Sequence, residues 1–237
     1  MSVLREILKV LPQERYVYFS DNAWCPYGEK SPEFIRERCR HITDLMLSKG
    51  ASAMVVACNT ATAAAIQTLR SEYEIPFVGM EPAVKPAALG TRSGVIGVLA
   101  TAGTLKGSKY LNTKGRFQDA VKIVEHIGQG FVELVESGKL TGPHAEEVVG
   151  KSLEPLLAAG ADTIVLGCTH YPFLLETLRK VAGPGINFID PAPAVARRLV
   201  EVLKENGIGP ADSRPDVELI SSGPDEALQR CYALIRR

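Results

Sequence analysis

A chain of 237 residues, of which 46% are hydrophobic, is long enough for one large or two small domains with buried cores. Its 27 basic and 27 acidic residues leave no net charge, which argues against a nucleic-acid or anionic-membrane surface. No apolar stretch approaches the roughly 20 residues of a membrane span, and the start lacks the basic and apolar regions of a signal peptide. Five cysteines without scaffold-like spacing are typical of a reducing compartment, so we expect a cytoplasmic protein.

Helical and extended patterns alternate along the whole chain, which predicts an α/β fold of mostly parallel sheets flanked by helices. The first predicted elements are a helix at 3–10, a strand at 15–19, a helix from the cap Ser31-Pro32 to Gly50, a strand at 53–57, a helix to about 73, strands at 77–78 and 95–99, and a short helix after 101. The remaining ones are a strand at 120–124, helices at 131–136 and 145–159, a strand at 163–166, a helix at 173–181, a strand at 186–189, a helix at 195–205, a strand at 217–220 and a helix at 225–235.

Two segments repeat one local pattern. Residues 55–60 read Val-Val-Ala-Cys-Asn-Thr, and residues 164–170 read Ile-Val-Leu-Gly-Cys-Thr-His. Each is an apolar run that stops at a cysteine and a hydroxyl residue and then continues into a helix-forming stretch. Such a run predicts a buried parallel strand, so Cys58 and Cys168 should lie at the carboxyl ends of strands, where open α/β sheets carry their chemistry.

The repeated pattern predicts two pseudo-symmetric lobes with the active site in a cleft between them. We expect residues 1–92 together with 193–237 to form the first lobe, carrying Cys58, and residues 93–192 to form the second, carrying Cys168. The crossings would lie near Thr91-Arg92-Ser93 and at Pro191-Ala192-Pro193. Residues 207–215, rich in Gly, Pro and Asp, come nearest to a flexible linker.

Four motifs give the chain a resemblance to the cofactor-independent glutamate racemases within the aspartate/glutamate racemase family. In chain order they are Asp21 with Pro26-Tyr27-Gly28, Ala57-Cys58-Asn59-Thr60, Gly97-Val98-Leu99-Ala100-Thr101 with Thr104, and Gly167-Cys168-Thr169-His170-Tyr171-Pro172. The resemblance implies a two-lobed α/β fold, interconversion of L- and D-glutamate, supply of D-glutamate for peptidoglycan, and no cofactor. It also implies glutamate as a small-molecule partner and, since such enzymes are often dimers, a homodimer.

Facing thiols suit such a reaction. Inversion of a carbon centre by proton transfer needs a base on one face of the substrate and an acid on the other, with the roles exchanged in reverse. Cysteine has a reference pKa near 8.5, so both thiol and thiolate are accessible near neutrality, and a helix amino terminus favours the thiolate. Because the α-proton of an amino acid is far less acidic than a thiol, desolvation and hydrogen bonds to the carboxylate must assist.

The resemblance assigns roles to individual residues. Cys58 would handle the proton on one face of the substrate and Cys168 on the other, with His170 assisting the second thiol. The residues expected to hold the substrate are Tyr27, Gly28, Asn59, Thr60, Thr101 and Thr169, and those expected to be auxiliary are Asp21, Thr104 and Glu136.

The start of the chain departs from the family pattern. Family members usually open with a strand that ends in Asp-Ser-Gly, before a stretch like Ser2-Val3-Leu4-Arg5-Glu6-Ile7, and this sequence lacks that opening. The absent aspartate would orient or activate the first thiol, and the absent strand would lie centrally in the first sheet. We therefore expect impaired activity, and we favour a late start assignment or a truncation over a genuinely shortened protein.

Other functions stay open at this stage. Cys58, Cys168 and His170 could bind zinc, or the thiols could form a disulfide, although no Cys-x-x-Cys spacing is present. The chain could also be a truncated, catalytically impaired glutamate-binding protein. Within the enzyme class, an aspartate or related racemase of the same family shares the two-cysteine plan.

Overall fold

A computed structural model describes residues 1–81, 83–210 and 214–236, which divide into two compact units. Val3–Met80 and the chain from Ala192 onward form the first unit, and Glu81–Pro191 form the second. The first crossing precedes the expected boundary after Arg92, because helix α4 (Val84–Gly90) packs against strands β4 (Val95–Ala100) and β6 (Thr163–Gly167) of the second unit. Cys58 therefore belongs to the first unit and Cys168 to the second.

The first unit alternates strands and helices as expected. Its elements are α1 (Ser2–Val10), β1 (Arg15–Ser20), the 3-10 turns η1 (Asn22–Trp24) and η2 (Tyr27–Glu29), α2 (Pro32–Ser48), β2 (Met54–Val56), α3 (Asn59–Glu72), β3 (Phe77–Gly79), α10 (Ala192–Glu205), β8 (Asp216–Ser221) and α11 (Glu226–Ile235). Helix α2 starts where the cap pattern predicted, because the Ser31 hydroxyl accepts a hydrogen bond from the Phe34 N–H and Pro32 occupies the first helical position. The predicted linker at 207–215 includes residues 211–213, which lie outside the described residues.

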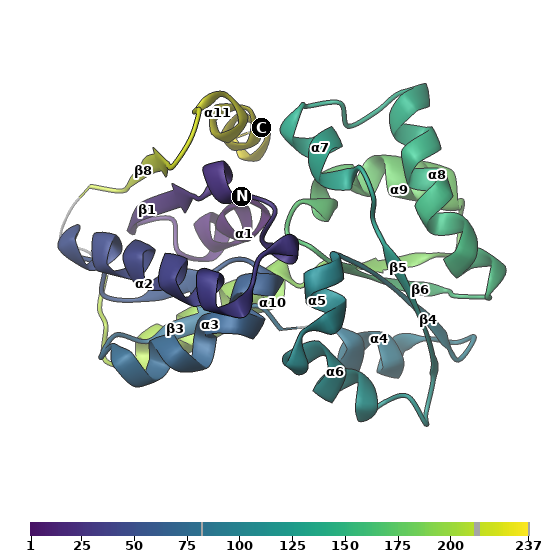
Figure 1. The fold of residues 1–237 in the computed structure, drawn as a ribbon, viewed down its shortest axis with the longest axis horizontal. Coiled ribbons are helices and arrows are strands. Elements are labelled where there is room, and N and C mark those ends of the chain that lie inside the picture. Colours follow the sequence, from purple (N-terminus) through teal and green to yellow (C-terminus); the bar gives the residue numbers. More distant parts are fainter. Residues whose placement is uncertain (82, 211–213, 237) are drawn as a thin grey trace. The chain divides into compact units, whose positions relative to one another are not determined.

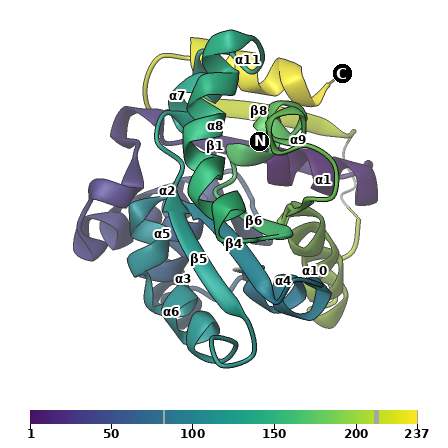
Figure 2. The ribbon, with the colours of Figure 1, turned by 90° about the vertical axis from the view of Figure 1, so that its right-hand side faces the viewer.

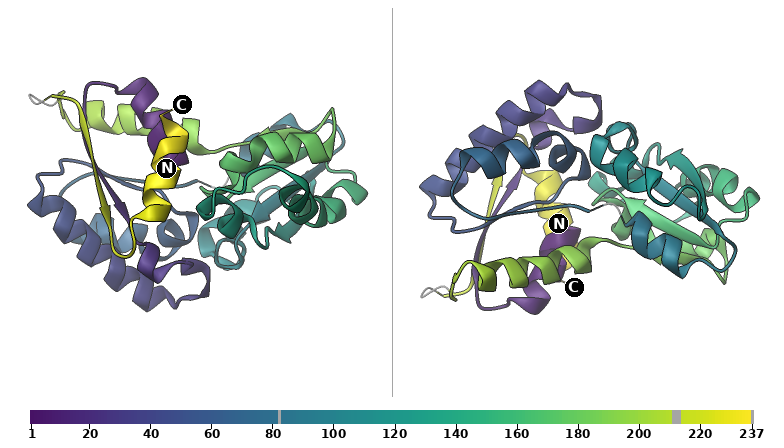
Figure 3. Two further views of the ribbon diagram at one scale, coloured as in Figure 1. Left: turned by 90° about the horizontal axis from the view of Figure 1, so that it is seen from above. Right: turned by 90° about the horizontal axis from the view of Figure 1, so that it is seen from below.

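Parallel pairing in the first unit is split into two short sheets. Strand β1 pairs only with β8, beside which it runs in both views of Figure 3, and β2 pairs only with β3. The residues of β1 and most of β2 are only half-buried, whereas inner parallel strands are normally covered completely. The single sheet expected in this lobe is thus divided into two pairs of strands. Among the described residues, β1 has no neighbouring strand on one side, and the same is true of β2.

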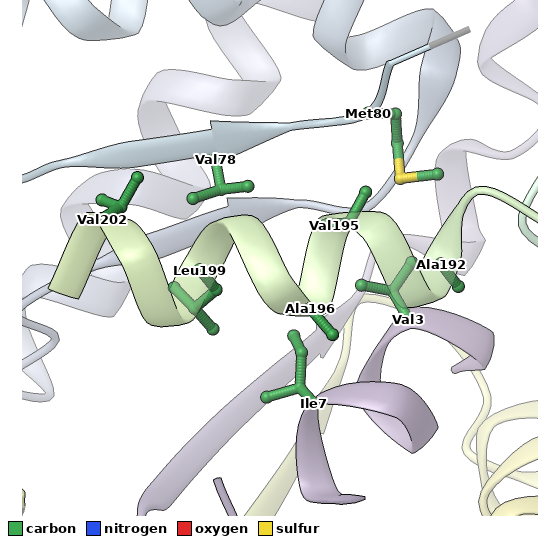
Figure 4. Close-up of a cluster of buried hydrophobic side chains, with 9 residues drawn as sticks. All are labelled: Val3, Ile7, Val78, Met80, Ala192, Val195, Ala196, Leu199 and Val202. Carbon is green, nitrogen blue, oxygen red and sulfur yellow. The ribbon is translucent and has the colours of Figure 1, made fainter. Parts of the chain in front are cut away.

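A core formed by helices and strands holds the first unit together. Figure 4 shows α10 lying between α1 and the strands β2 and β3, with its apolar face turned into the cluster. Tyr16 of β1 and Val55 of β2 pack against the same cluster, so one core joins the two strand pairs although they share no backbone ladder. Its buried members are Val3, Ile7, Val78, Met80, Ala192, Val195, Ala196, Leu199 and Val202.

Thr62 ties the ends of β2 and β3 to helix α3. Its buried hydroxyl donates to the Val56 carbonyl at 3.0 Å and accepts from the Met80 N–H at 3.0 Å. A Cβ on Gly79 would lie 2.6 Å from the Thr62 methyl group, so the glycine permits this close packing. The same side chain thus fixes the turn that follows β2, which carries Cys58.

The second unit contains one four-stranded parallel sheet in the order β5-β4-β6-β7, with β5 at Lys122–Ile127 and β7 at Asn187–Ile189. Its helices include α8 (Pro143–Ala158) and α9 (Leu175–Ala182) on one face and α4 and α6 (Ser108–Gly115) on the other, as Figures 1 and 2 show. Strand β6 is buried along its whole length. This confirms the predicted α/β class of parallel sheets flanked by helices. The remaining elements are α5 (Ala102–Lys106), α7 (Phe131–Glu136) and the 3-10 turn η3 (Tyr171–Leu174).

Two helices of this unit were not predicted, and one strand is displaced. Helix α6 has a single buried residue, Tyr110, and α4 has only Val84 and Ala87, so neither shows a clear apolar stripe in the sequence. The predicted strand at 120–124 is β5, shifted towards Ile127. Among the described residues, no helix combines the length and the apolar composition needed to cross a membrane.

Thr62→Val tests the tie between the two strand ends. Valine keeps the shape of threonine but leaves the Met80 N–H and the Val56 carbonyl without the hydroxyl, so we expect a loss of about 2 kcal/mol in the free energy of unfolding. Urea unfolding measures it, with Thr68→Val on the same helix as the control. Equal stability of the two variants would contradict this role of the hydroxyl.

Asp162 closes the turn before β4 and makes the stability of the second unit pH-dependent. Its carboxylate accepts from the Thr91 hydroxyl at 2.6 Å and from the Arg92 and Ser93 N–H groups at 2.7 and 2.8 Å. Burial alone would raise the pKa of Asp162, but these hydrogen bonds outweigh it and lower the pKa from 3.8 to about 2.

Because the folded-state pKa is depressed, the stabilising contribution of Asp162 is present above pH 3.8 and is lost as the pH falls towards about 2. We expect Asp162→Ala to lower the free energy of unfolding by about 1 kcal/mol at pH 6, allowing for solvent screening. The difference from wild type should shrink as the pH falls through this window in urea titrations. Asp119→Ala, which removes an exposed carboxylate, is the control, and a pH-independent difference would contradict the assignment.

Candidate active site

Cys58 caps the helix that follows β2. It has an extended backbone between the strand and α3, and its sulfur accepts a hydrogen bond from the Ala61 N–H at 3.5 Å. The Cys58 carbonyl accepts the first helical bond, from the Thr62 N–H at 2.8 Å. The sulfur thus occupies the N-cap position, where backbone N–H groups and the helix dipole favour negative charge. The sequence predicted this placement at a strand end and a helix start.

The other predicted residues of the first unit gather around the start of α3. Asn59 and Thr60 form its first turn and are both 8% exposed. Turn η2 contacts α3, and the Tyr27 ring and Cys58 pack against one apolar cluster that includes Ile35, Cys39 and Ala61. The structure therefore brings Tyr27 and Gly28 to the same part of the unit as Cys58, although the two motifs are far apart in the sequence.

Asp21 is held in place by an arginine that sequence reasoning missed. Arg38 on α2 grips both carboxylate oxygens, with Nη2 2.5 Å from Oδ1 and Nε 3.0 Å from Oδ2, and the Tyr27 hydroxyl donates to Oδ2. Burial raises the pKa of Asp21, but hydrogen bonds from Arg38, Tyr27 and Ser222 outweigh it and hold the pKa below its usual range. The sequence offered one weak indication of this role for Arg38. The residue adjoins Cys39, which belongs to the core and lies on the same helix.

In the second unit, Thr101 and Cys168 follow neighbouring strands at one edge of the sheet. Strands β4 and β6 pair in parallel with Ala100 opposite Gly167. A Cβ on Gly167 would lie 2.6 Å from the Ala100 Cβ and 3.0 Å from the Leu99 carbonyl oxygen, so only glycine allows this approach.

Thr101 caps α5 and contacts Thr104, the two hydroxyl oxygens being 3.0 Å apart. Both predicted threonines therefore lie at the strand edge from which Cys168 emerges.

Cys168, His170 and Glu136 form a chain of polar contacts. The Cys168 sulfur lies 3.8 Å from His170 Nδ1, and His170 Nε2 lies 3.3 Å from Glu136 Oε1. Turn η3 packs against α7, and the Tyr171 hydroxyl donates to the carbonyl of Gly128, just before that helix, at 3.3 Å. This packing holds Glu136, which the resemblance had given only as an auxiliary residue, within reach of His170. Thr169 is half-buried in the turn between Cys168 and His170.

The charge of His170 is set by its two neighbours. Burial alone would lower the pKa of His170, but hydrogen bonding and charge from Cys168 and Glu136 outweigh it and raise the pKa to about 9. The imidazole is therefore protonated near neutral pH and donates from both ring nitrogens. Its side chain is 28% exposed, so the ring borders solvent rather than being sealed in the core.

The two cysteines have different local supports. After Cys168 the chain makes a turn and the 3-10 segment η3 before α9 begins at Leu175, later than the predicted start at Phe173. Pro172 explains the delay, because proline has no N–H and disfavours helical geometry in the residue before it. The Cys58 sulfur thus contacts a backbone N–H at a helix start, whereas the Cys168 sulfur contacts the His170 imidazolium.

The structure offers little to the metal and disulfide alternatives. Among residues 1–81, 83–210 and 214–236, no group of three or more His, Cys, Asp or Glu side chains is placed to hold a metal ion. None of the five cysteines, all of which lie in the described part of the chain, forms a disulfide.

Sequence comparison decides the family. The pattern of the Asp/Glu/hydantoin racemase family matches this sequence over residues 1–199. The chain belongs to this family. Two relatives named glutamate racemase are similar to it over 236 residues. The one from Ectopseudomonas mendocina (strain ymp) is 47% identical over 99% of this chain and 90% of its own length. The one from Methylococcus capsulatus is 46% identical over 99% of this chain and 87% of its own length.

Solved structures of family members share the fold. Glutamate racemase RacE1 from Bacillus anthracis has a TM-score of 0.87 and 29% identity, covering 100% of this chain and 90% of that protein. Escherichia coli glutamate racemase, solved with L-glutamate and the activator UDP-MurNAc-ala, has a TM-score of 0.86 and 34% identity with the same coverage. Since the sequence matches span 99% of this racemase-family chain, the comparisons do not support the expectation of impaired activity.

Glu136→Gln tests the origin of the imidazolium. Glutamine removes the negative charge beside Nε2, so we expect the His170 pKa to fall from about 9 towards the ordinary 6.5. NMR titration of the four histidine ring signals measures it, with His170→Gln to assign the resonance. Glu133→Gln, an exposed carboxylate on the same helix, is the control and should leave the His170 pKa in place. An unchanged pKa in Glu136→Gln would contradict the pairing.

Proposed function

We propose that this chain is a glutamate racemase that interconverts L- and D-glutamate by two-base proton transfer between Cys58 and Cys168. The observation that carries the proposal is that each unit places one cysteine outside any disulfide directly after a strand of a parallel sheet, with a backbone N–H or an imidazole nitrogen next to its sulfur. The names of the relatives give glutamate as the substrate class, and the E. coli structure holds L-glutamate itself. In this reaction one thiol would act on each face of the bound amino acid.

The chemistry balances without a cofactor. One cysteine thiolate takes the α-proton from one face and becomes a thiol, leaving a carbanion on the substrate. The other cysteine, as a thiol, returns a proton to the opposite face and becomes a thiolate, so the product has inverted configuration and the two sulfurs have exchanged charge. The reverse reaction uses the same groups in exchanged roles. In this scheme the His170 imidazolium stabilises the Cys168 thiolate and the Ala61 N–H that of Cys58.

The remaining residues would hold the substrate. Hydroxyl, amide and backbone N–H groups next to the thiols can receive the carboxylates and the ammonium of glutamate, and they would orient its α-carbon for proton transfer. We assign this role to Tyr27, Gly28, Asn59, Thr60, Thr101 and Thr169, with Asp21, Thr104 and Glu136 as auxiliary residues. Supply of D-glutamate for peptidoglycan, a cytoplasmic location and a homodimer stay predictions from the resemblance.

We also propose that the first sheet accepts one further strand, the one that ends in Asp-Ser-Gly in the family. Within the described part of the chain, β1 and β2 each have a neighbouring strand on one side alone, which supports this because an added parallel strand could pair with the other side. Racemisation and thermal stability should be compared for this chain with and without such an opening segment. If the segment changed neither property, this part of the proposal would fail while the two-cysteine chemistry stood.

Cys58→Ala and Cys168→Ala should each abolish racemisation, because each removes the proposed proton donor or acceptor on one face. The assay follows circular dichroism of L- or D-glutamate incubated in deuterated water, together with loss of the α-proton signal by NMR. Cys231→Ala, which changes a buried cysteine of α11, is the control and should retain turnover. Near-normal turnover in both directions by either single active-site variant would defeat the two-base assignment.

The same assay separates the alternatives. Faster inversion of L-aspartate than of L-glutamate would favour an aspartate racemase. Saturable glutamate binding in calorimetry without deuterium exchange at the α-carbon would favour a binding protein. Turnover that survives exhaustive chelation would eliminate a zinc enzyme, whereas stoichiometric zinc in the purified protein would favour one.

A further inference from the structure

A buried ion pair fastens the loop that carries Tyr27 and Gly28. The Asp21 side chain is 8% exposed and the Arg38 side chain 18%, and they meet through two hydrogen bonds in a bidentate arrangement. Such pairs are geometrically specific, because the planar guanidinium fixes the plane of the carboxylate. The Tyr27 hydroxyl donates to Oδ2, one of the oxygens that Arg38 holds.

Aromatic contacts add to this arrangement from the solvent side. The Trp24 ring lies over the Arg38 guanidinium, 5.5 Å from its carbon to the ring centroid, and packs against Phe34 of α2 with 5.4 Å between centroids. Asp21 and Trp24 of this loop therefore both contact Arg38 of α2, and Tyr27 is joined to the same group through Asp21. Trp24 is also the only tryptophan in the chain, so its fluorescence reports on this loop alone.

The position of the ion pair links it to the proposed substrate site. Turn η2, which begins at Tyr27, contacts α3, and the Tyr27 ring shares an apolar cluster with Cys58. A shift of the loop would therefore move Tyr27 and Gly28 relative to the thiol. The ion pair also matters for charge, because Arg38 neutralises a carboxylate that would otherwise repel an anionic substrate near this loop.

We propose that Arg38 is a positioning residue for substrate binding: through the Asp21 carboxylate it fixes Tyr27, and so holds Tyr27 and Gly28 where they receive a carboxylate of the amino-acid substrate. The inference rests on the proposed function, since it takes this loop as part of the substrate site. It assigns Arg38 no contact with the substrate and no proton-transfer step.

Arg38→Gln is the decisive variant. A loop that binds the substrate equally in the ground and transition states affects KM and leaves kcat in place. We expect KM for both glutamate enantiomers to rise about tenfold while kcat stays within about twofold of wild type. Arg38→Lys should recover part of the loss, because an ammonium neutralises Asp21 but cannot bind both of its oxygens.

A matched control lies two residues away on the same helix. Arg40 forms an equally bidentate pair with Glu72, and both hydrogen bonds are 2.7 Å long. Glu72 lies far along the chain from the loop that carries Tyr27. Arg40→Gln therefore removes an equally bidentate but more exposed ion pair and should leave KM unchanged. An Arg38→Gln variant with unchanged KM, or with kcat lost and KM retained, would overturn the proposal.

Tyr27→Phe keeps the test decisive if Arg38→Gln does not fold. It removes one hydroxyl and should raise KM in the same direction, and in the double variant the two effects should be less than additive because both act through Asp21. Additive effects, or a Tyr27→Phe variant with wild-type KM, would count against the mechanism.

Titration of Trp24 fluorescence with glutamate separates this inference from the proposed function. A saturable change that weakens about tenfold in Arg38→Gln, in a protein without racemase activity, would overturn the racemase and keep the positioning role. Racemase activity with the same apparent affinity for glutamate in wild type and in Arg38→Gln would keep the racemase and overturn the positioning role. If the protein showed no racemase activity and no fluorescence response to glutamate, both the proposed function and the positioning role would be overturned.

Discussion

The site in the second unit depends on how closely two parallel strands approach at their carboxyl ends. Ala100 and Gly167 stand opposite each other, and any side chain on Gly167 would collide with the neighbouring strand. Because the strands end together, Thr101 and Cys168 emerge side by side. The first unit has a counterpart: Gly79 leaves room for Thr62, whose hydroxyl joins the ends of β2 and β3 beneath the turn that carries Cys58.

The two thiols are equivalent in the proposed chemistry but not in their surroundings. A backbone N–H at a helix start supports the sulfur of Cys58, whereas His170 supports that of Cys168 and is itself held by Glu136. The first support is a dipole that does not titrate, and the second is a charge with a pKa of about 9. The faces of a racemase site can therefore differ in pH response even though each performs the same proton transfer.

Local patterns predicted most of the fold. The helices that carry a clear apolar stripe, such as α1 and α10, have nearly the predicted bounds, and so do the buried strands β4 and β6. Prediction failed for α4 and α6, which bury few residues, and for the boundary between the units, because α4 packs on the second sheet rather than the first. The division of the first sheet into two pairs also escaped prediction, since strand pairing is a long-range property that no single segment encodes.

The sequence by itself determined that Cys58 and Cys168 lie at strand ends, because a β-branched run followed by a helix-forming stretch specifies that geometry locally. It also determined the cap at Ser31 and the proximity of His170 to Cys168, two residues away. Only the tertiary structure decided that Arg38 grips Asp21 and that Glu136 reaches His170. Those partners come from different elements, and their meeting depends on how helices and turns pack, which the spacing of residues along one segment does not contain.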